Sequence, residues 1–353
     1  MGALIFEYEE VLQLVEALNN MQILFHPKYM EIGKIEMNNL SELRSKDIMI
    51  FIDSNILSPI YELSKYGKTN DENGLIIASS LILFSKIIGA RITSGLALIE
   101  NESNSKQAIS SKEKVQYYLH AINNFPPMLW KDITWGNIDT IPVQFRLKNI
   151  KENNIDDKSD NVYKIENNIH FIQHKIALIK MVYLLKTEGY SFETFYYFFN
   201  WYIDNLLICE SLIVYAAMVF GNIEGVKAPK NINSSNYNKV LNGIENQAWD
   251  IHHLSQWSTF YGHEDEFNKV NFFATNDTTL KYIIINSIFS ESIDSICCVF
   301  NDDKQCEKII SLVNSKLGSN RICPLDIKNT KDTLKTLDKL LLQVNDELLS
   351  LFK

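Results

Sequence analysis

The stretch that decides the fold is Ile48-Met-Ile-Phe-Ile52, which Asp53-Ser54-Asn55 closes. Five apolar residues in a row are typical of a strand that is buried on both faces, as strands of parallel sheets are. A second run of this kind, Phe272-Phe-Ala-Thr275, is closed by Asn276-Asp277. Each of these acids follows a predicted strand. In parallel α/β sheets functional groups gather at the carboxyl ends of the strands, so we expect a site there.

Predicted helices flank both strands in the sequence. Apolar residues at helical spacing predict helices over residues 4–24, 56–66, 75–88 and 239–260, one helix after Asp277, and two more from about 303 and about 330. Residues 171–221 predict two long apolar helices with a break near Gly189. Residues 90–93 and 295–300 are predicted as short strands. Strands that alternate with helices indicate a three-layer α/β fold with a mainly parallel central sheet.

The net charge limits the ways in which the chain could bind nucleic acid. The formal net charge is -9, and the composition is that of a globular protein, with 46% hydrophobic and 22% charged residues. Coating nucleic acid by bulk attraction requires clustered Lys and Arg, so this class is disfavoured. A nuclease stays compatible with the charge, because a carboxylate metal site is itself acidic and a small basic strip can hold a strand.

Cysteine usage and apolar runs bear on the compartment. The five cysteines are odd in number and include no C-x-x-C pair, so we expect neither a disulfide framework nor a zinc site. This cysteine usage is typical of a protein in the reducing cytoplasm. Of the adjacent Cys297 and Cys298, one is expected in the core. The amino terminus has no basic region typical of a secretory signal. Glu210 interrupts the most apolar stretch, residues 206–220, so we expect no membrane span.

Four segments each place one acid next to an apolar element. They are FIDSN at 51–55, GLALIEN at 95–101, AWDIHHLSQ at 248–256 and ATNDTTL at 274–280. Their acids are Asp53, Glu100, Asp250 and Asp277. This order resembles the PIN-domain nucleases, in which an Asp ends the first strand, a Glu lies in an early helix, an Asp opens a late helix and another Asp completes a T-x-D signature. Thr275-Asn276-Asp277 reproduces that signature.

The resemblance covers roughly residues 45–103 and 238–300, a minority of the chain, and it implies a domain organisation. We expect a helical N-terminal extension over 1–47, the first half of a PIN-like domain over 48–103, a mostly helical insertion over 104–235, the second half over 236–300 and a C-terminal helical part over 301–353. Compact members of the family do not need so long a separation between Glu100 and Asp250.

Clustered carboxylates suit phosphodiester hydrolysis because hard divalent cations take oxygen ligands and can activate water. Two unit charges ~4 Å apart repel by ~4 kcal/mol at an effective dielectric of about 20, so an assembled cluster favours Mg²⁺ or Mn²⁺ as a cofactor. We assign Asp53 and Asp277 as main direct ligands, with Glu100 and Asp250 acting directly or through bound water. The residues expected to position water or phosphate are Asn55, His253, Thr275 and Asn276.

Each of these residues also has a purely structural interpretation. Asp53 could end a strand in an Asx turn, Asp277 or Asn276 could cap the next helix, and Asp250 and Glu100 could be solvated helix residues. His253 could simply pack or lie at the surface. His170 and His174 have a metal-ligand spacing, but no H-E-x-x-H motif accompanies it. The aromatic residues over 190–202 favour a core or dimer surface of the insertion, because they are not interleaved with Lys or Arg.

The resemblance implies an endoribonuclease that acts on RNA, in a toxin or defence setting. Two alternatives stay open: a catalytically inactive PIN-like module that binds protein or RNA, and a structure-specific DNA nuclease. An inhibitory protein partner and a homo-oligomer formed through the apolar insertion are also compatible with the sequence.

Overall fold

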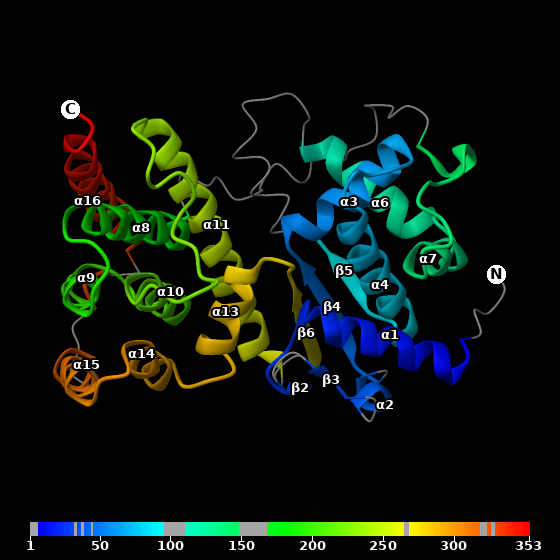
Figure 1. Ribbon diagram of the computed structural model, residues 1–353, viewed down its shortest axis with the longest axis horizontal. Coiled ribbons are helices and arrows are strands. Elements are labelled where there is room, and N and C mark those ends of the chain that lie inside the picture. Colours follow the sequence, from blue (N-terminus) through cyan, green and yellow to red (C-terminus); the bar gives the residue numbers. More distant parts are fainter. Residues whose placement is uncertain are drawn as a thin grey trace. The chain divides into compact units, whose positions relative to one another are not determined.

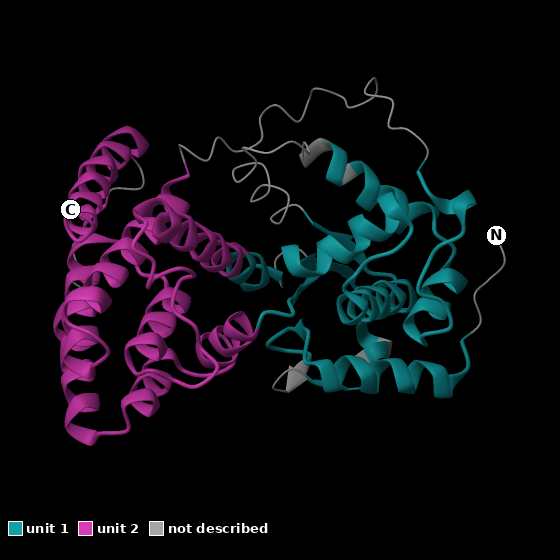
Figure 2. Cartoon of the chain, turned by 45° about the horizontal axis from the view of Figure 1, so that its top comes forward, with its two compact units in different colours: residues 1–162, 257–277 teal, residues 163–256, 278–353 magenta. Residues whose placement is uncertain are grey.

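The computed structural model describes residues 6–31, 34–36, 39–43, 45–94, 111–147, 168–264, 268–317, 323–325 and 329–353. The chain forms two compact units (Figure 2). Unit 1 comprises residues 1–162 and 257–277, and unit 2 comprises residues 163–256 and 278–353. Among the described residues, the chain passes between the units inside one long helix and again directly after Asp277. The fold as described is mixed α/β.

Unit 1 contains a four-stranded sheet in the order β1-β6-β4-β5. Its strands are β1 (Leu24–Phe25), β4 (Asp47–Ile52), β5 (Arg91–Thr93) and β6 (Lys269–Ala274). The interior strand β4 runs parallel to both neighbours, with Ile52 opposite Ala274 and Ile50 opposite Ile92. Only β1 is antiparallel. The sheet is therefore small and mixed, and the structure confirms residues 48–52 as an interior strand with parallel neighbours. A separate hairpin pairs β2 (Met30–Glu31) with β3 (Lys34–Ile35).

Aromatic side chains cover one face of this sheet. Phe51 of β4 and Phe273 of β6 are register partners and point to the same face. Phe51 stacks on Phe260 at 5.1 Å between ring centroids, and Phe273 lies 5.4 Å from Trp257. Both partners belong to the end of α11 (Tyr237–Gly262). This stretch of helix therefore belongs to the core of unit 1.

Further helices complete unit 1 (Figure 1). They are α1 (Tyr8–Met21), α2 (Asn39–Leu43), α3 (Ser54–Tyr66), α4 (Glu72–Ile88), α6 (Ser111–Asn124) and α7 (Pro127–Thr134). Helix α4 packs against α1, α3 and α7 and is buried along most of its length. An apolar surface on all sides of a helix requires such burial, which explains why residues 75–88 carry so little polar sequence.

The described part of unit 2 is helical. Besides most of α11, it contains α8 (Ile169–Thr187), α9 (Phe192–Asn205), α10 (Glu210–Phe220), α13 (Thr278–Ser287), α14 (Ser292–Phe300), α15 (Asp303–Lys316) and α16 (Thr330–Ser350). Helix α16 packs along α8, and α10 packs against α9, α13 and α14. Phe195, Phe198 and Tyr202 of α9 are buried, so this part of the aromatic cluster forms core.

Three sequence predictions for unit 2 are wrong. Residues 171–221 form three helices, because a second break at 206–209 follows the expected one at Gly189, which has a φ of 80°. Residues 295–300 belong to helix α14, since a short apolar run does not distinguish a strand from a buried helix. Cys297 forms a disulfide with Cys306, and Cys298 is exposed. The turn between α14 and α15 brings the bonded pair together, which the nine-residue spacing did not indicate.

No single described helix has both the length and the apolar character needed to cross a bilayer. Helices α13 and α14 reach that length and composition only as a pair, and they are bent by 117° relative to each other.

Candidate active site

The carboxyl ends of β4 and β6 meet at one edge of the sheet. Asp53 follows β4 and Thr275 follows β6, and the two strands are adjacent and parallel. The Asp53 amide donates to the Ala274 carbonyl at 2.9 Å, and the Thr275 amide donates to the Ile23 carbonyl at 2.9 Å. These bonds extend the strand ladder by one residue on each strand, so the backbone fixes where both side chains emerge.

A hydrogen-bond network joins the two strand ends. The Thr275 hydroxyl donates to Asp53 Oδ2 at 2.8 Å and accepts from the Asp277 amide at 3.0 Å. Asn55 Nδ2 donates to Asp53 Oδ2 at 2.5 Å, while Asn55 Oδ1 accepts from the Asn276 amide at 3.1 Å. Five of the residues that the sequence selected are thus brought into one network.

Burial and charge act together on Asp53. Its side chain belongs to a residue that is 2% exposed, whereas Asn276 and Asp277 are exposed. Burial raises the pKa of Asp53, and repulsion from Asp277 adds to this, while hydrogen bonds from Thr275 and Ser54 oppose it. The edge therefore pairs a buried acid with a solvent-facing acid, and a cation would relieve the unfavourable charge on both.

Asp53 also has a structural role. It is the N-cap residue of α3, and its Oδ1 accepts from the Ser54 amide at 2.6 Å and the Ser54 hydroxyl at 3.3 Å. With two further donors on Oδ2, all four lone-pair sites of this carboxylate are used.

The hydrogen-bond network of the described residues does not include the three other predicted site residues. Glu100 is outside the described residues. Asp250 and His253 belong to the unit 2 part of α11, where Asp250 is half-buried and His253 packs its ring 5.9 Å from Trp249. In the part of the chain that the structure describes, no group of three or more His, Cys, Asp or Glu side chains is placed to hold a metal ion. The described site therefore contributes two acids, Asp53 and Asp277.

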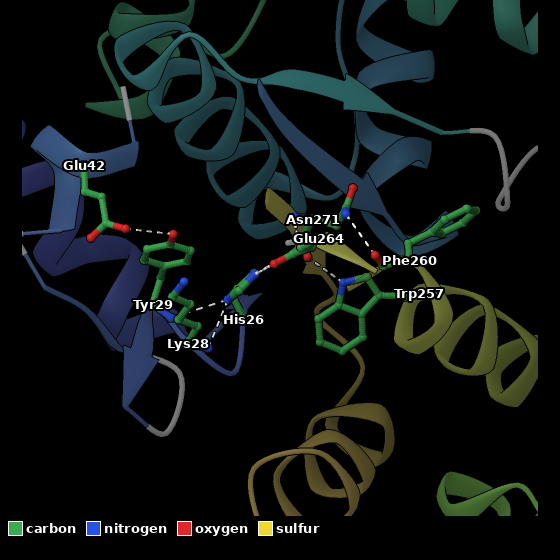
Figure 3. Close-up of polar contacts among 8 residues, drawn as sticks. All are labelled: His26, Lys28, Tyr29, Glu42, Trp257, Phe260, Glu264 and Asn271. Carbon is green, nitrogen blue, oxygen red and sulfur yellow. Dashed lines mark hydrogen bonds and ion pairs between the residues drawn. The ribbon is translucent and has the colours of Figure 1, made fainter. Parts of the chain in front are cut away.

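A buried His26–Glu264 pair was not found by sequence reasoning, because the two residues are 238 positions apart (Figure 3). His26 Nε2 lies 2.9 Å from Glu264 Oε2, and His26 Nδ1 accepts from the Lys28 amide at 3.1 Å. The Glu264 carboxylate also accepts from the Asn271 amide. His26 follows β1 and Glu264 precedes β6, and the pair contacts Asn271 and Phe272 in the middle of β6. Since both imidazole nitrogens are satisfied, we interpret the pair as a structural clamp.

Replacing Glu264 with alanine is expected to destabilise unit 1 by about 1–3 kcal/mol, because it removes the acceptor of two buried donors, His26 Nε2–H and the Asn271 amide. Glu264→Gln keeps one carbonyl oxygen and should cost clearly less. Chemical denaturation followed by circular dichroism measures both. Equal losses of unfolding free energy in Glu264→Ala and Glu264→Gln would contradict a stabilising role of the Glu264 hydrogen bonds.

Comparisons of this chain with family models, with curated proteins and with solved structures return no match.

Proposed function

We propose that the edge formed by Asp53, Asn55, Thr275, Asn276 and Asp277 binds Mg²⁺ or Mn²⁺, and that the protein is a PIN-like endoribonuclease with a three-layer PIN-like domain. The observation that carries this proposal is the Thr275 bridge, which ties the buried Asp53 to the Asp277 backbone across two parallel strand ends. A T-x-D segment in that position is the feature on which the resemblance depends.

The proposed roles follow from the contacts. Asp53 and Asp277 would hold the cation, with Glu100 and Asp250 as further ligands. Bound there, the cation would activate water and offset charge on the phosphate. Thr275 and Asn55 orient the Asp53 carboxylate through their hydrogen bonds. Asn276 is exposed beside the pair and could contact phosphate or water. His253 would contact the phosphate only if α11 presents it there.

RNA is the proposed substrate class, and a toxin or defence setting with an inhibitory protein partner is the proposed context. Both come from the resemblance. The test incubates the full chain with structured RNA, single-stranded DNA and duplex DNA, with Mn²⁺ or Mg²⁺. We expect cleavage of RNA that stops with EDTA and returns with excess Mn²⁺. Cleavage of DNA alone would replace RNA with the DNA-nuclease alternative. No cleavage together with no Mn²⁺ binding by calorimetry would contradict the proposal.

One observation favours a second candidate, a PIN-like module that binds protein or RNA without cutting. All four lone-pair sites of Asp53 are already used by protein donors, as expected of a carboxylate with a structural task. This candidate predicts no heat of Mn²⁺ binding at millimolar concentration. It also predicts RNA retention in a gel-shift assay that is unaffected by EDTA.

A further inference from the structure

Two aromatic rings of the sheet lie next to the Asp53–Thr275 contact. In β4 the side chains of Phe51 and Asp53 point to one face of the sheet, because they are two residues apart. Their neighbours in β6, Phe273 and Thr275, point to the same face. On each strand the ring is about 7 Å from the polar residue that follows it. A side chain that covers these rings is therefore close to the proposed metal site.

Phe260, near the end of α11, covers one of the two rings and is itself exposed. Its ring is nearly parallel to that of Phe51, with an interplanar angle of 10° and 5.1 Å between the centroids. Phe51 is 9% exposed, whereas Phe260 is 44% exposed. One face of the Phe260 ring therefore packs on the sheet, and the other face is open to solvent.

Two hydrogen bonds fix the position of Phe260 relative to the sheet (Figure 3). Trp257 Nε1 donates to the Asn271 carbonyl at 2.7 Å, and Asn271 Nδ2 donates to the Phe260 carbonyl at 3.2 Å. The Trp257 ring also packs on Phe273. The last turns of α11 are thus held to β6, so the Phe260 ring loses little further conformational freedom when a ligand binds to it.

A flat ring with one open face, held beside a cation site, suits a nucleobase. Every base has a π-face, so aromatic side chains stack on unpaired bases with little regard to sequence. A base inside a helix is already stacked on its neighbours, so the ring selects an unpaired nucleotide. A cation held by Asp53 and Asp277 would bind the phosphate, and the ring therefore needs no adjacent Lys or Arg in a chain with a net charge of -9.

We propose that Phe260 is a stacking platform for an unpaired base next to the scissile phosphate, so that the protein acts on single-stranded segments of RNA. The inference rests on the proposed function, which places the phosphate at Asp53 and Asp277. It adds to that function a substrate-binding residue and a preference for unpaired bases. The distance of about 7 Å between Phe51 and Asp53 along β4 is comparable with the length of one nucleotide in an extended strand.

Phe260 variants test the platform by the kinetics of cleavage with Mn²⁺. Phe260→Leu keeps an apolar cover over Phe51 but removes the flat face, whereas Phe260→Tyr keeps the ring. We expect Phe260→Leu to raise the KM for a single-stranded RNA oligonucleotide about 10-fold with little change in kcat, and Phe260→Tyr to match the wild type. Tyr8→Leu is the matched control, because Tyr8 is an exposed ring at the start of α1, about 20 Å from the end of that helix that leads into β1.

An abasic nucleotide in the RNA separates stacking from a structural role of Phe260. Removing the base beside the scissile phosphate should raise the KM of the wild type about 10-fold and affect Phe260→Leu much less, because the variant has no stacking to lose. Equal losses in both proteins would overturn the proposal. Duplex RNA of the same sequence that is cleaved as fast as the single strand would overturn the preference for unpaired bases.

The outcomes distinguish this inference from the proposed function. Fluorescence anisotropy of a labelled RNA measures binding where no cleavage occurs. A wild type that cleaves RNA with a KM unaffected by Phe260→Leu would overturn the platform and leave the nuclease in place. RNA binding that depends on Phe260 without any cleavage would support the platform and contradict the nuclease. A wild type that neither binds nor cleaves RNA would overturn both.

Discussion

Replacing Asp277 with asparagine is expected to lower metal-dependent cleavage at least about 100-fold while it makes the folded protein more stable. Asp277 raises the pKa of the buried Asp53 by repulsion, and at neutral pH the substitution removes this repulsion. Asparagine is as good as aspartate at the start of a helix, so the entry into α13 should be preserved. Initial cleavage rates with Mn²⁺ and thermal unfolding without metal measure the two effects.

The pH dependence of stability independently gives the sign of the stability change expected for Asp277→Asn. The pKa of Asp53 is higher in the folded protein than the value of about 3.9 in an unfolded chain. The stability linked to this group is therefore full below about pH 3.9 and is lost as the pH rises through the folded pKa. Asp277→Asn should lower the folded pKa and reduce that loss, and so the gain in stability should be larger at pH 7 than at pH 4.

Asp71→Asn is the matched control. Asp71 is also an acid at the start of a helix of unit 1, and its Oδ1 accepts from the Gly74 amide at 2.8 Å as the N-cap of α4. Asparagine keeps this cap, so neither activity nor stability should change much. An Asp277→Asn variant that is less stable and cleaves like the wild type would make Asp277 a structural residue.

The sheet and the described part of its edge could be predicted from sequence because their signals are local. Five consecutive apolar residues ending at Ile52 require burial on both faces, and a strand of that kind belongs inside a sheet. The structure confirms β4 as an interior strand with β6 parallel beside it. Because β4 and β6 are parallel and also adjacent, Asp53 and Thr275 lie close together at the edge that their carboxyl ends share.

What could not be predicted depends on contacts between distant segments. The His26–Glu264 pair and the Cys297–Cys306 disulfide leave no periodic signal, because each needs a particular approach of two elements. Asp250 lies in a helix, as expected, but this helix passes from unit 2 into unit 1. A pattern of apolar residues does not indicate where a long helix leaves the core of one unit and enters the core of another. The role of Glu100 and Asp250 as further metal ligands stays a prediction.

Gly243→Ala is expected to destabilise unit 2 by about 3 kcal/mol, although alanine is the better helix former. Gly243 lies inside α11, and a Cβ there would overlap the Lys230 carbonyl. This carbonyl belongs to a turn that has little freedom to retreat. Ile232 donates to Pro229 at 3.3 Å, and Asn231 adopts a φ of 62° while its Nδ2 donates to the Lys239 carbonyl at 3.4 Å.

Gly262→Ala on the same helix separates the steric effect from helix propensity. A Cβ at Gly262 meets no atom within 4 Å, so the substitution should be neutral or stabilising by up to about 1 kcal/mol. Denaturation curves of both variants, recorded with circular dichroism, make the comparison. If Gly243→Ala matched Gly262→Ala, the turn at 229–232 would have to move freely away from α11, and the close approach would not constrain the packing of unit 2.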